Sequence, residues 1–397
     1  MLGICLLENP IRHYPWGSHT AIARLQRRPS PTSQPEAELW MGAHPAAPSR
    51  VRRDDAWLPL TDVLRDVSKE ALGPRVSTRF GSELPFLFKL LAASEPLSIQ
   101  AHPDAAQARD GFERENAAGV PLEAPNRNYR DPHPKPELIC ALTPFWALHG
   151  FRSCEAIAEG FRAFGIDELA PEVDALERDG NGVGHQRFFA SIMNAGADRV
   201  ARAISQAVLP AVESPTSRWF AKLACAYPQD VGALAPLLLN VVRLEPGEAI
   251  YLGAGELHSY LEGVGIEIMA NSDNVLRGGL TPKHVDVPEL SRTLTFESGD
   301  PVILRPVLRS TGECVFETPA PQFELAALRL EPDTTWSSGS ARGPEIWLVT
   351  EGDAEFSDPA SGQTLTISQG ESVFIPDCVD AYQLAGVATL YRACVPR

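Results

Sequence analysis

A short alternating stretch, residues 96–104, carries the side chains best suited to metal chemistry. Its sequence, Pro-Leu-Ser-Ile-Gln-Ala-His-Pro-Asp, alternates apolar and polar residues with the period of a β-strand whose two faces meet different surroundings. The polar face would carry Ser98, Gln100 and His102, and the apolar face would carry Leu97, Ile99 and Ala101. Because Gln100 and His102 are two residues apart on one face, both could bind the same ion. A lone histidine is more often a packing residue, so further donors are needed.

Two later stretches supply donors and charges of the kinds that such a site would need. In Lys135-Pro136-Glu137 the first and third residues have the same strand parity, so both can face one cavity. The second stretch, residues 250–283, contains His258, Asp273 and Arg277. Its residues 271–283 read Asn-Ser-Asp-Asn-Val-Leu-Arg-Gly-Gly-Leu-Thr-Pro-Lys, and the two glycines would let the backbone approach a ligand closely.

Together these stretches resemble the type I mannose-6-phosphate isomerase family, and they occur in that family's order. The resemblance extends more weakly to residues 14–17 and 38–42, and it covers most of residues 1–155 and 240–295. The family holds zinc through Gln, His, Glu and a second His. The resemblance therefore implies one Zn²⁺ per chain, bound by Gln100, His102, Glu137 and His258, and these donor types suit zinc.

The resemblance also implies a reaction, the interconversion of mannose 6-phosphate and fructose 6-phosphate through a cis-enediol. A site charge of about +1, from Zn²⁺ and the anionic Glu137, would polarise an oxygen of this small sugar-phosphate substrate. Arg277 matches a position that the family treats as catalytic. Lys135 and Asp273 are candidates for proton movement, with a salt bridge that shapes the loop as the alternative for each. Lys89 and Ser98 are the predicted phosphate contacts.

One departure from the family pattern concerns proton transfer. The family commonly has a histidine directly before Lys-Pro-Glu, whereas this chain has Pro134 there and His133 one position earlier. A proline side chain can neither titrate nor donate a hydrogen bond. We therefore expect any role of that histidine to be absent or to have moved to His133.

Composition and charge exclude several classes of partner. The chain has 397 residues, 44% of them hydrophobic, and a formal net charge of −16. The length suits two or three domains, and the negative charge argues against nucleic acid and anionic membranes as partners. No apolar run approaches the roughly 20 residues of a membrane span. Seven scattered cysteines without a Cys-x-x-Cys motif, and no recognisable secretory signal, predict a cytoplasmic protein. A monomer is expected, with a homodimer as the alternative.

The predicted elements are those of a mainly β protein, with cupin-type jelly-roll barrels and an α-helical insertion. Residues 1–152 and 241–296 would form the catalytic zinc-binding barrel, residues 153–240 the helical insertion, and residues 297–397 a cupin-like barrel without metal. Residues 345–376 repeat the strand-turn-strand pattern that precedes His258, but no histidine follows His284. A short helix is predicted over residues 60–72, with Thr61 as its cap.

Two other functions would use similar residues. A cupin oxygenase would bind iron through two histidines and a carboxylate and keep open positions on the metal. The additional Gln100 and the surrounding lysines and arginine argue against that function. A non-catalytic cupin that binds sugar phosphates is the second alternative, in which the metal would be structural.

Overall fold

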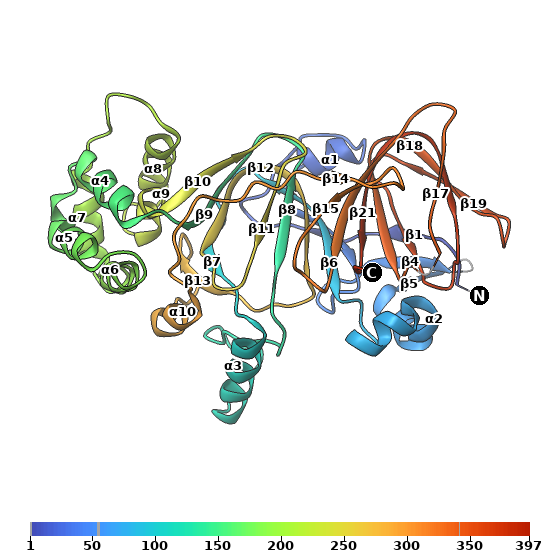
Figure 1. Ribbon diagram of the computed structural model, residues 1–397, viewed down its shortest axis with the longest axis horizontal. Helices are drawn as coiled ribbons and strands as arrows, with labels where there is room; N and C mark the ends of the chain where they lie inside the picture. Colours follow the sequence, from blue (N-terminus) through green and yellow to red (C-terminus); the bar gives the residue numbers. More distant parts are fainter. Residues whose placement is uncertain (1, 54–55, 341) are drawn as a thin grey trace.

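Two antiparallel sheets form the body of the protein, and a group of helices lies at one end of it (Figure 1). The computed structural model describes residues 2–53, 56–340 and 342–397. Strands account for 32% of the residues and helices for 28%, so the prediction of a mainly β fold is confirmed. No helix among the described residues is long and apolar enough to cross a lipid bilayer.

The first sheet has ten strands, and β12 (His258–Ala270) connects most of them. β12 pairs with β6 (Phe86–Ala93), β7 (Ile99–Ala101), β8 (Glu137–Ala141) and β9 (Phe145–Phe151). The other strands are β2 (Ile11–Arg12), β3 (Glu38–Gly42), β10 (Leu239–Leu244), β11 (Ala249–Leu252) and β13 (Leu276–Gly279). Because β7 and β8 both pair with β12, a single strand brings together the three segments that carry the predicted zinc ligands.

The second sheet is built from C-terminal strands and completed by N-terminal ones. Its C-terminal strands are β14 (Val307–Leu308), β15 (Cys314–Phe316), β16 (Glu324–Leu330), β17 (Thr335–Ser337), β18 (Glu345–Asp358), β19 (Gln363–Ser368), β20 (Ser372–Ile375) and β21 (Gln383–Cys394). β1 (Cys5–Glu8) pairs with β20, and β4 (Arg50–Arg53) and β5 (Ala56–Pro59) extend the sheet beyond β1. These pairings satisfy backbone groups that would otherwise be exposed at the edge of the sheet.

Because N-terminal strands belong to the second sheet, the predicted domain boundaries need a correction. Residues 1–152 do not lie wholly in the first sheet, because β1, β4 and β5 belong to the second. Met1, at which the first predicted range begins, lies outside the described residues. With those three strands moved, we retain as a proposal the division into a zinc-binding barrel, a helical insertion and a metal-free C-terminal barrel.

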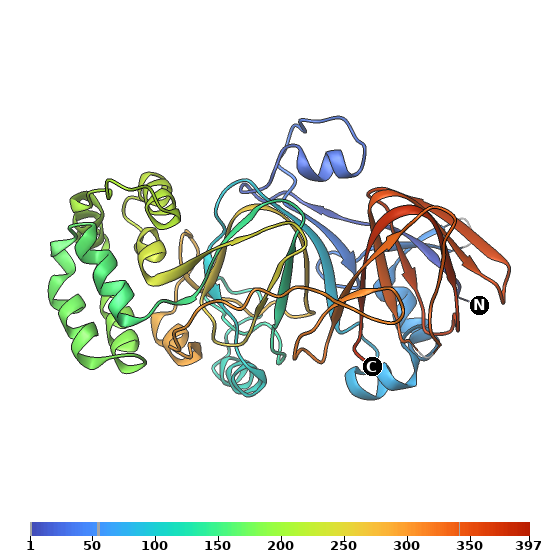
Figure 2. The same cartoon turned by 45° about the horizontal axis from the view of Figure 1, so that its top comes forward.

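Six helices fill the chain between β9 and β10, and Figure 2 shows them stacked beside the first sheet. They are α4 (Cys154–Ala163), α5 (Ala170–Asp179), α6 (Val183–Met193), α7 (Ala197–Gln206), α8 (Pro215–Ala226) and α9 (Ala235–Leu238), with 3₁₀ turns at Asp167–Leu169 and Val231–Leu234. Their buried side chains share one hydrophobic core with Ile99, Leu257 and Leu276. These three residues directly precede Gln100, His258 and Arg277, so the helices support the segments that carry the site.

The alternation predicted for residues 96–104 is correct within β7 and wrong before it. Ile99 and Ala101 lie in the core shared with the helices, whereas Gln100 lines a cavity on the other side. Leu97 precedes the strand, packs in a different core with Phe145 and also lines that cavity. The strand geometry that imposes alternation begins only at Ile99.

The helix predicted over residues 60–72 is longer in the structure. α2 spans Leu60–Phe80, with non-helical backbone at Val67 and Gly73. The expected cap is wrong, because Pro59 occupies the N-cap position and Thr61 lies inside the first turn. Gly73 has a φ of 76°, which a glycine adopts without strain, so a further helical stretch can begin beyond it. The remaining helices are α1 (Ala21–Leu25), α3 (Ala105–Ala117) and α10 (Val287–Thr293).

A buried network of charges lies within the second sheet. The carboxylate of Glu345 accepts hydrogen bonds from Arg342 at 2.7 Å, from Arg392 at 2.9 Å and from the Tyr382 hydroxyl at 2.6 Å. Burial opposes ionisation of Glu345, but Arg392 and Arg342 outweigh it and lower the pKa of this carboxyl. Replacing the carboxylate would therefore leave the buried guanidinium of Arg342 without its carboxylate partner, whereas Arg392 would keep Glu313 at 2.7 Å.

We expect Glu345→Gln to lower the free energy of unfolding of the second sheet by about 3–5 kcal/mol, the usual cost of breaking a buried ion pair. Chemical denaturation followed by circular dichroism measures the change. The matched control is Glu331→Gln, which removes an exposed carboxylate 2.9 Å from Arg329 and should cost at most about 1 kcal/mol.

The effect of Glu345→Gln should also depend on pH. Because the pKa of Glu345 is lowered in the folded protein, its stabilisation is present above the unfolded value of about 4.3 and is lost as the pH falls further. The difference between wild type and variant should therefore shrink below about pH 4. Equal costs for the two variants at pH 7 would contradict a stabilising role for the network.

Candidate metal centre and active site

Three buried side chains from the first sheet converge on one point. His102 directly follows β7, Glu137 begins β8 and His258 begins β12. His102 Nε2 lies 3.3 Å from Glu137 Oε1, and His258 Nε2 lies 3.7 Å from Glu137 Oε2. Their ligand atoms all lie within 4.8 Å of one another. Across residues 2–53, 56–340 and 342–397, no other group of His, Cys, Asp and Glu side chains is arranged in this way.

Backbone carbonyl groups determine which nitrogen of each imidazole is free. His102 Nδ1 lies 2.9 Å from the carbonyl oxygen of Asn274, and His258 Nδ1 lies 2.9 Å from that of Glu256. Because a carbonyl oxygen only accepts hydrogen bonds, each Nδ1 must carry the proton. Each Nε2 therefore has a free lone pair, and both face Glu137. Carbonyl partners of this kind commonly orient histidine ligands of metals.

Burial and charge give these groups the protonation states that a metal ion needs. Burial, followed by the nearby His102, lowers the pKa of His258 to about 3, and burial also lowers the pKa of His102. Burial opposes ionisation of Glu137, but Lys135 and His102 hold its pKa well below the ordinary value. His102 Nε2, His258 Nε2 and Glu137 Oε2 are all buried without a hydrogen-bond partner. Two neutral imidazoles, one carboxylate and these unpartnered atoms fit Zn²⁺.

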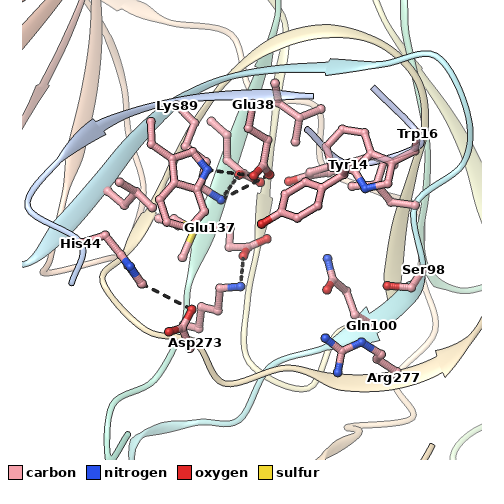
Figure 3. Close-up of a pocket in the computed structure, with 18 of the residues that line it drawn as sticks. Tyr14, Trp16, Glu38, His44, Lys89, Ser98, Gln100, Glu137, Asp273 and Arg277 are labelled. Carbon is pink, nitrogen blue, oxygen red and sulfur yellow. Dashed lines mark hydrogen bonds and ion pairs between the residues drawn. The ribbon is translucent and has the colours of Figure 1, made fainter. Parts of the chain in front are cut away.

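Gln100, the fourth predicted ligand, lies next to this group. In the strand register it is opposite His258 on β12 and opposite Arg277 on β13. Its amide projects into the cavity, below Tyr14 in the view of Figure 3. Its position therefore suits the predicted set, and its coordination of zinc stays a prediction.

A cavity of about 230 Å³ opens beside these ligands and brings together most of the predicted site. The predicted residues that line it are Lys89, Ser98, Gln100, Lys135, Glu137, Asp273 and Arg277. His102 and His258 are not among the lining residues and are almost fully buried, with 0% and 1% exposure. Lys135 Nζ lies 3.2 Å from Glu137 Oε1, so the expected shared orientation of these two side chains is confirmed.

Lys89 lines the cavity, but its ammonium group already has anionic partners. It lies in the middle of β6, 2.9 Å from Glu267 Oε2 and 3.6 Å from Glu38 Oε1 (Figure 3). Burial would lower the pKa of Lys89, but Glu267 and Glu38 raise it, so the side chain stays charged. The two carboxylates already pair with this ammonium group, so its charge is compensated within the protein. The predicted phosphate contact of Lys89 is therefore opposed by the charge around it.

Asp273 has a partner that we did not predict. His44 Nδ1 accepts a hydrogen bond from the backbone N–H of Ala46 at 3.2 Å, so Nε2 carries the proton. That Nε2 lies 3.4 Å from Asp273 Oδ1. The hydrogen bond from His44 lowers the pKa of Asp273, which is therefore ionised at neutral pH.

Arg277 and Lys283 form the cationic side of the cavity. Within the part of the chain that the structure describes, neither has a carboxylate within ion-pair distance of its side chain. Burial, together with the nearby Arg130, lowers the pKa of Arg277. Burial, Arg277 and Arg130 lower the pKa of Lys283. Cations that lack counter-ions in the protein favour an anionic ligand between them.

The structure decides between the two expectations for the histidine that the family commonly has before Lys-Pro-Glu. His133 is exposed and lines a separate cavity with Arg79 and Phe80. It does not line the cavity that contains Asp273 and Glu137. Pro134 lines that same separate cavity, so neither position 133 nor position 134 contributes a side chain to the site, and His133 does not take over the role of the family histidine.

Several lining residues were missed by the sequence reasoning. Tyr14 and Trp16 stack at 5.6 Å beside Gln100 and Ser98 (Figure 3), and Glu38, Trp40, His44, Tyr260, Glu267 and Lys283 also line the cavity. Tyr14, Trp16, Glu38, Trp40 and Lys283 lie in stretches that carry the family resemblance, which could have drawn attention to them. Tyr260 and Glu267 also lie within residues 250–283, whereas His44 lies outside the quoted stretches and has no such signal in the sequence alone.

Comparisons with known proteins agree with this geometry. Residues 4–154 match the family model of the phosphomannose isomerase type I catalytic domain. Mannose-6-phosphate isomerase of Escherichia coli K12 is 41% identical over 375 residues, which cover 93% of this chain and 94% of that protein. Mannose-6-phosphate isomerase 1 of Arabidopsis thaliana is 34% identical over 415 residues, covering 98% of this chain and 93% of the relative.

Solved structures resemble the whole molecule. A crystal structure of a phosphomannose isomerase mutant from Salmonella typhimurium superimposes with a TM-score of 0.92 at 37% identity, covering 100% of both chains. A zinc-bound mannose 6-phosphate isomerase superimposes with a TM-score of 0.91 at 38% identity, again over 100% of both chains. The motifs, the cavity and full-length similarity agree, and this chain belongs to the type I mannose-6-phosphate isomerase family.

Proposed function

We propose that this protein is a zinc-dependent isomerase that interconverts mannose 6-phosphate and fructose 6-phosphate. The observation that carries the proposal is the buried group of His102, Glu137 and His258 at a cavity lined by both carboxylates and cations. The relatives that match nearly the whole chain are mannose-6-phosphate isomerases. A small sugar phosphate is therefore the proposed substrate.

We infer that Gln100, His102, Glu137 and His258 hold the zinc ion. When bound, zinc acts as a Lewis acid that polarises a carbonyl or hydroxyl oxygen and offsets negative charge that develops on it. The hydrogen bonds from both Nδ1 atoms keep His102 and His258 in the tautomer that leaves Nε2 free for this purpose. Lys135 stabilises the ionised form of Glu137.

The reaction moves one proton between C1 and C2 of the open-chain sugar and a second proton between O2 and O1, through a cis-enediol or enediolate. We propose that Asp273 and Lys135 carry these protons, and that each returns to its starting protonation state when the reaction is complete. Asp273 is ionised, which is the state of a general base, and it lies on the cavity wall with His44 as its hydrogen-bond partner. Lys135 Nζ is 3.2 Å from Glu137 and could return a proton to the same region.

Arg277 is the proposed group that stabilises the enediolate. Its guanidinium lacks a carboxylate partner among the described residues and projects into the cavity beside Gln100 (Figure 3). A planar guanidinium can donate two parallel hydrogen bonds to adjacent oxygens. Charge that grows on those oxygens during the reaction would strengthen this interaction in the transition state.

The assembly and location of the protein are also proposals. We propose a cytoplasmic monomer, with a homodimer as the alternative that analytical ultracentrifugation would reveal. Neither nucleic acid nor a membrane is an expected partner, because the net charge is −16. A cupin oxygenase would consume oxygen, and a non-catalytic sugar-phosphate-binding cupin would bind mannose 6-phosphate without turnover.

The metal prediction is one zinc ion per chain that activity requires. Chelation should abolish the conversion of mannose 6-phosphate, and stoichiometric zinc should restore it. Elemental analysis and a coupled assay for fructose 6-phosphate measure both quantities. Full activity in protein shown to be free of metal would contradict the proposal.

The second prediction separates catalysis from zinc binding. Arg277→Ala should retain zinc and fold while kcat falls by roughly 10²–10³, as for other donors that stabilise an oxyanion. Arg277→Lys should recover only part of the rate, because lysine keeps the charge and loses the planar fork. Steady-state kinetics with parallel zinc analysis give these values.

His258→Ala is the matched comparison for Arg277→Ala. It should lose zinc and activity together, because its Nε2 is one of the ligand atoms. A rise in KM with unchanged kcat for Arg277→Ala would assign Arg277 to substrate binding.

The third prediction concerns the phosphate group. If Ser98 donates a hydrogen bond to it, Ser98→Ala should raise KM about tenfold, which corresponds to about 1.4 kcal/mol, and leave kcat nearly unchanged. Lys89→Met should likewise raise KM if Lys89 contacts the phosphate. Steady-state kinetics measure both variants, with Ser205→Ala on α7 as a control that removes an exposed hydroxyl.

Lys283→Ala completes this comparison because Lys283 lacks the anionic partners of Lys89. An unchanged KM for Ser98→Ala and Lys89→Met, with a large increase for Lys283→Ala, would place the phosphate on the Arg277 side of the cavity. That outcome would reject the predicted contacts of Lys89 and Ser98.

A further inference from the structure

We propose that Asn274 is a positioning residue for the zinc centre, fixing His102 through its backbone and the segment leading to Glu137 through its side chain. Asn274 has 0% exposure and does not line the cavity. It would therefore act through the two ligands and without touching the substrate. This inference rests on the proposed zinc centre and adds a residue to it.

The backbone of Asn274 determines the tautomer of His102. Its carbonyl oxygen lies 2.9 Å from His102 Nδ1, and both residues are fully buried. The proton must therefore lie on Nδ1, and the lone pair on Nε2 faces Glu137. If the carbonyl moved, the imidazole could rotate or exchange its proton between the two nitrogens, and the free lone pair would no longer be aligned with the other ligands.

The side chain of Asn274 holds the loop that precedes Glu137. Its Oδ1 accepts hydrogen bonds from the backbone N–H groups of Arg130 at 2.7 Å and Asp131 at 3.3 Å. Its Nδ2 donates to the carbonyl oxygens of Asp131 at 2.8 Å and His133 at 2.9 Å. The amide oxygen and both amide hydrogens of Asn274 are thus all bonded to the backbone of residues 130–133. The next residues along the chain include Lys135 and Glu137.

A second contact fixes the same two segments to each other. The Asp131 carboxylate accepts hydrogen bonds from the Ser272 hydroxyl at 2.8 Å and from the backbone N–H of Asp273 at 2.8 Å. The loop and the segment around Asn274 are therefore joined from both sides. The Asn274 amide and the Asp131 carboxylate therefore together link the loop before Glu137 to the segment that carries Asp273 and contacts His102.

The chemistry of the contacts requires an amide at position 274. Asparagine offers one acceptor and two donor hydrogens, which match the two N–H groups and the two carbonyl oxygens of the loop. Aspartate has the same shape but offers acceptors only. Asn274→Asp would place a carboxylate oxygen against the carbonyl oxygens of Asp131 and His133 while it keeps the backbone carbonyl that contacts His102.

The test measures zinc affinity of the full-length protein, by competition between the metal-free chain and a fluorescent chelator. We expect Asn274→Asp to bind zinc 10–100-fold more weakly than wild type, the usual effect of disturbing a residue that orients a ligand. Cobalt-substituted protein should show an altered visible spectrum, because the arrangement of the ligands changes. Both readouts are independent of catalytic turnover.

Asn240→Asp is the matched control. Its amide also donates to backbone carbonyls, those of His149 at 3.2 Å and Gly299 at 2.9 Å, but it contacts no predicted zinc ligand. The same substitution there should lower the thermal midpoint and change zinc affinity less than twofold. If Asn274→Asp fails to fold, Asp131→Asn replaces it. The Asp131 carboxylate forms the second contact between the loop and the segment around Asn274, so weakening it should also weaken zinc binding.

Zinc affinity and cobalt spectra within the range of the Asn240→Asp control would overturn the proposal for Asn274. Wild-type protein that bound no zinc at this site would overturn it as well, together with the proposed function. Wild-type protein that bound zinc but did not isomerise mannose 6-phosphate would overturn only the proposed function. In that case weaker zinc binding by Asn274→Asp would still support the positioning role.

Discussion

The arrangement of the site follows from the burial of one carboxylate between two imidazoles. Glu137 has 2% exposure, and an isolated anion at such a position would be strongly destabilised. Lys135 at 3.2 Å compensates its charge on one side, while His102 and His258 face it with unprotonated nitrogens. A divalent cation between these atoms satisfies all of them at once. The other features of the first sheet keep these atoms in place.

The fold provides this placement through a single long strand and a hydrophobic support. β12 pairs with both β7 and β8, so residues far apart in the sequence are held at fixed separations by backbone hydrogen bonds. On the reverse side, Ile99 and Leu257 pack into the core of the helices that follow β9. Gln100 and His258 are thus each preceded by a residue that anchors the backbone in this core, and the helices support the site without contributing ligands.

Sequence reasoning could identify residues whose side chains are characteristic metal ligands or charged groups. Gln100, His102, Glu137 and His258 could be named because donor types, strand parity and a family resemblance agree. The partners of charged groups could not be named, since they depend on strand register. Lys89 meets Glu267 because β6 and β12 pair at those positions, and Glu38 faces Lys89 from β3. Likewise, nothing local indicates that β1 joins the C-terminal sheet or that His44 reaches Asp273.

The central claim is that zinc is bound by Nε2 of His102, Nε2 of His258 and a carboxylate oxygen of Glu137. The most direct test is a crystal structure of the zinc-loaded protein with anomalous data at the zinc absorption edge. The account predicts one strong peak, about 2.0–2.2 Å from each of these three atoms. A zinc ion bound elsewhere, or bound to either histidine through Nδ1, would contradict it.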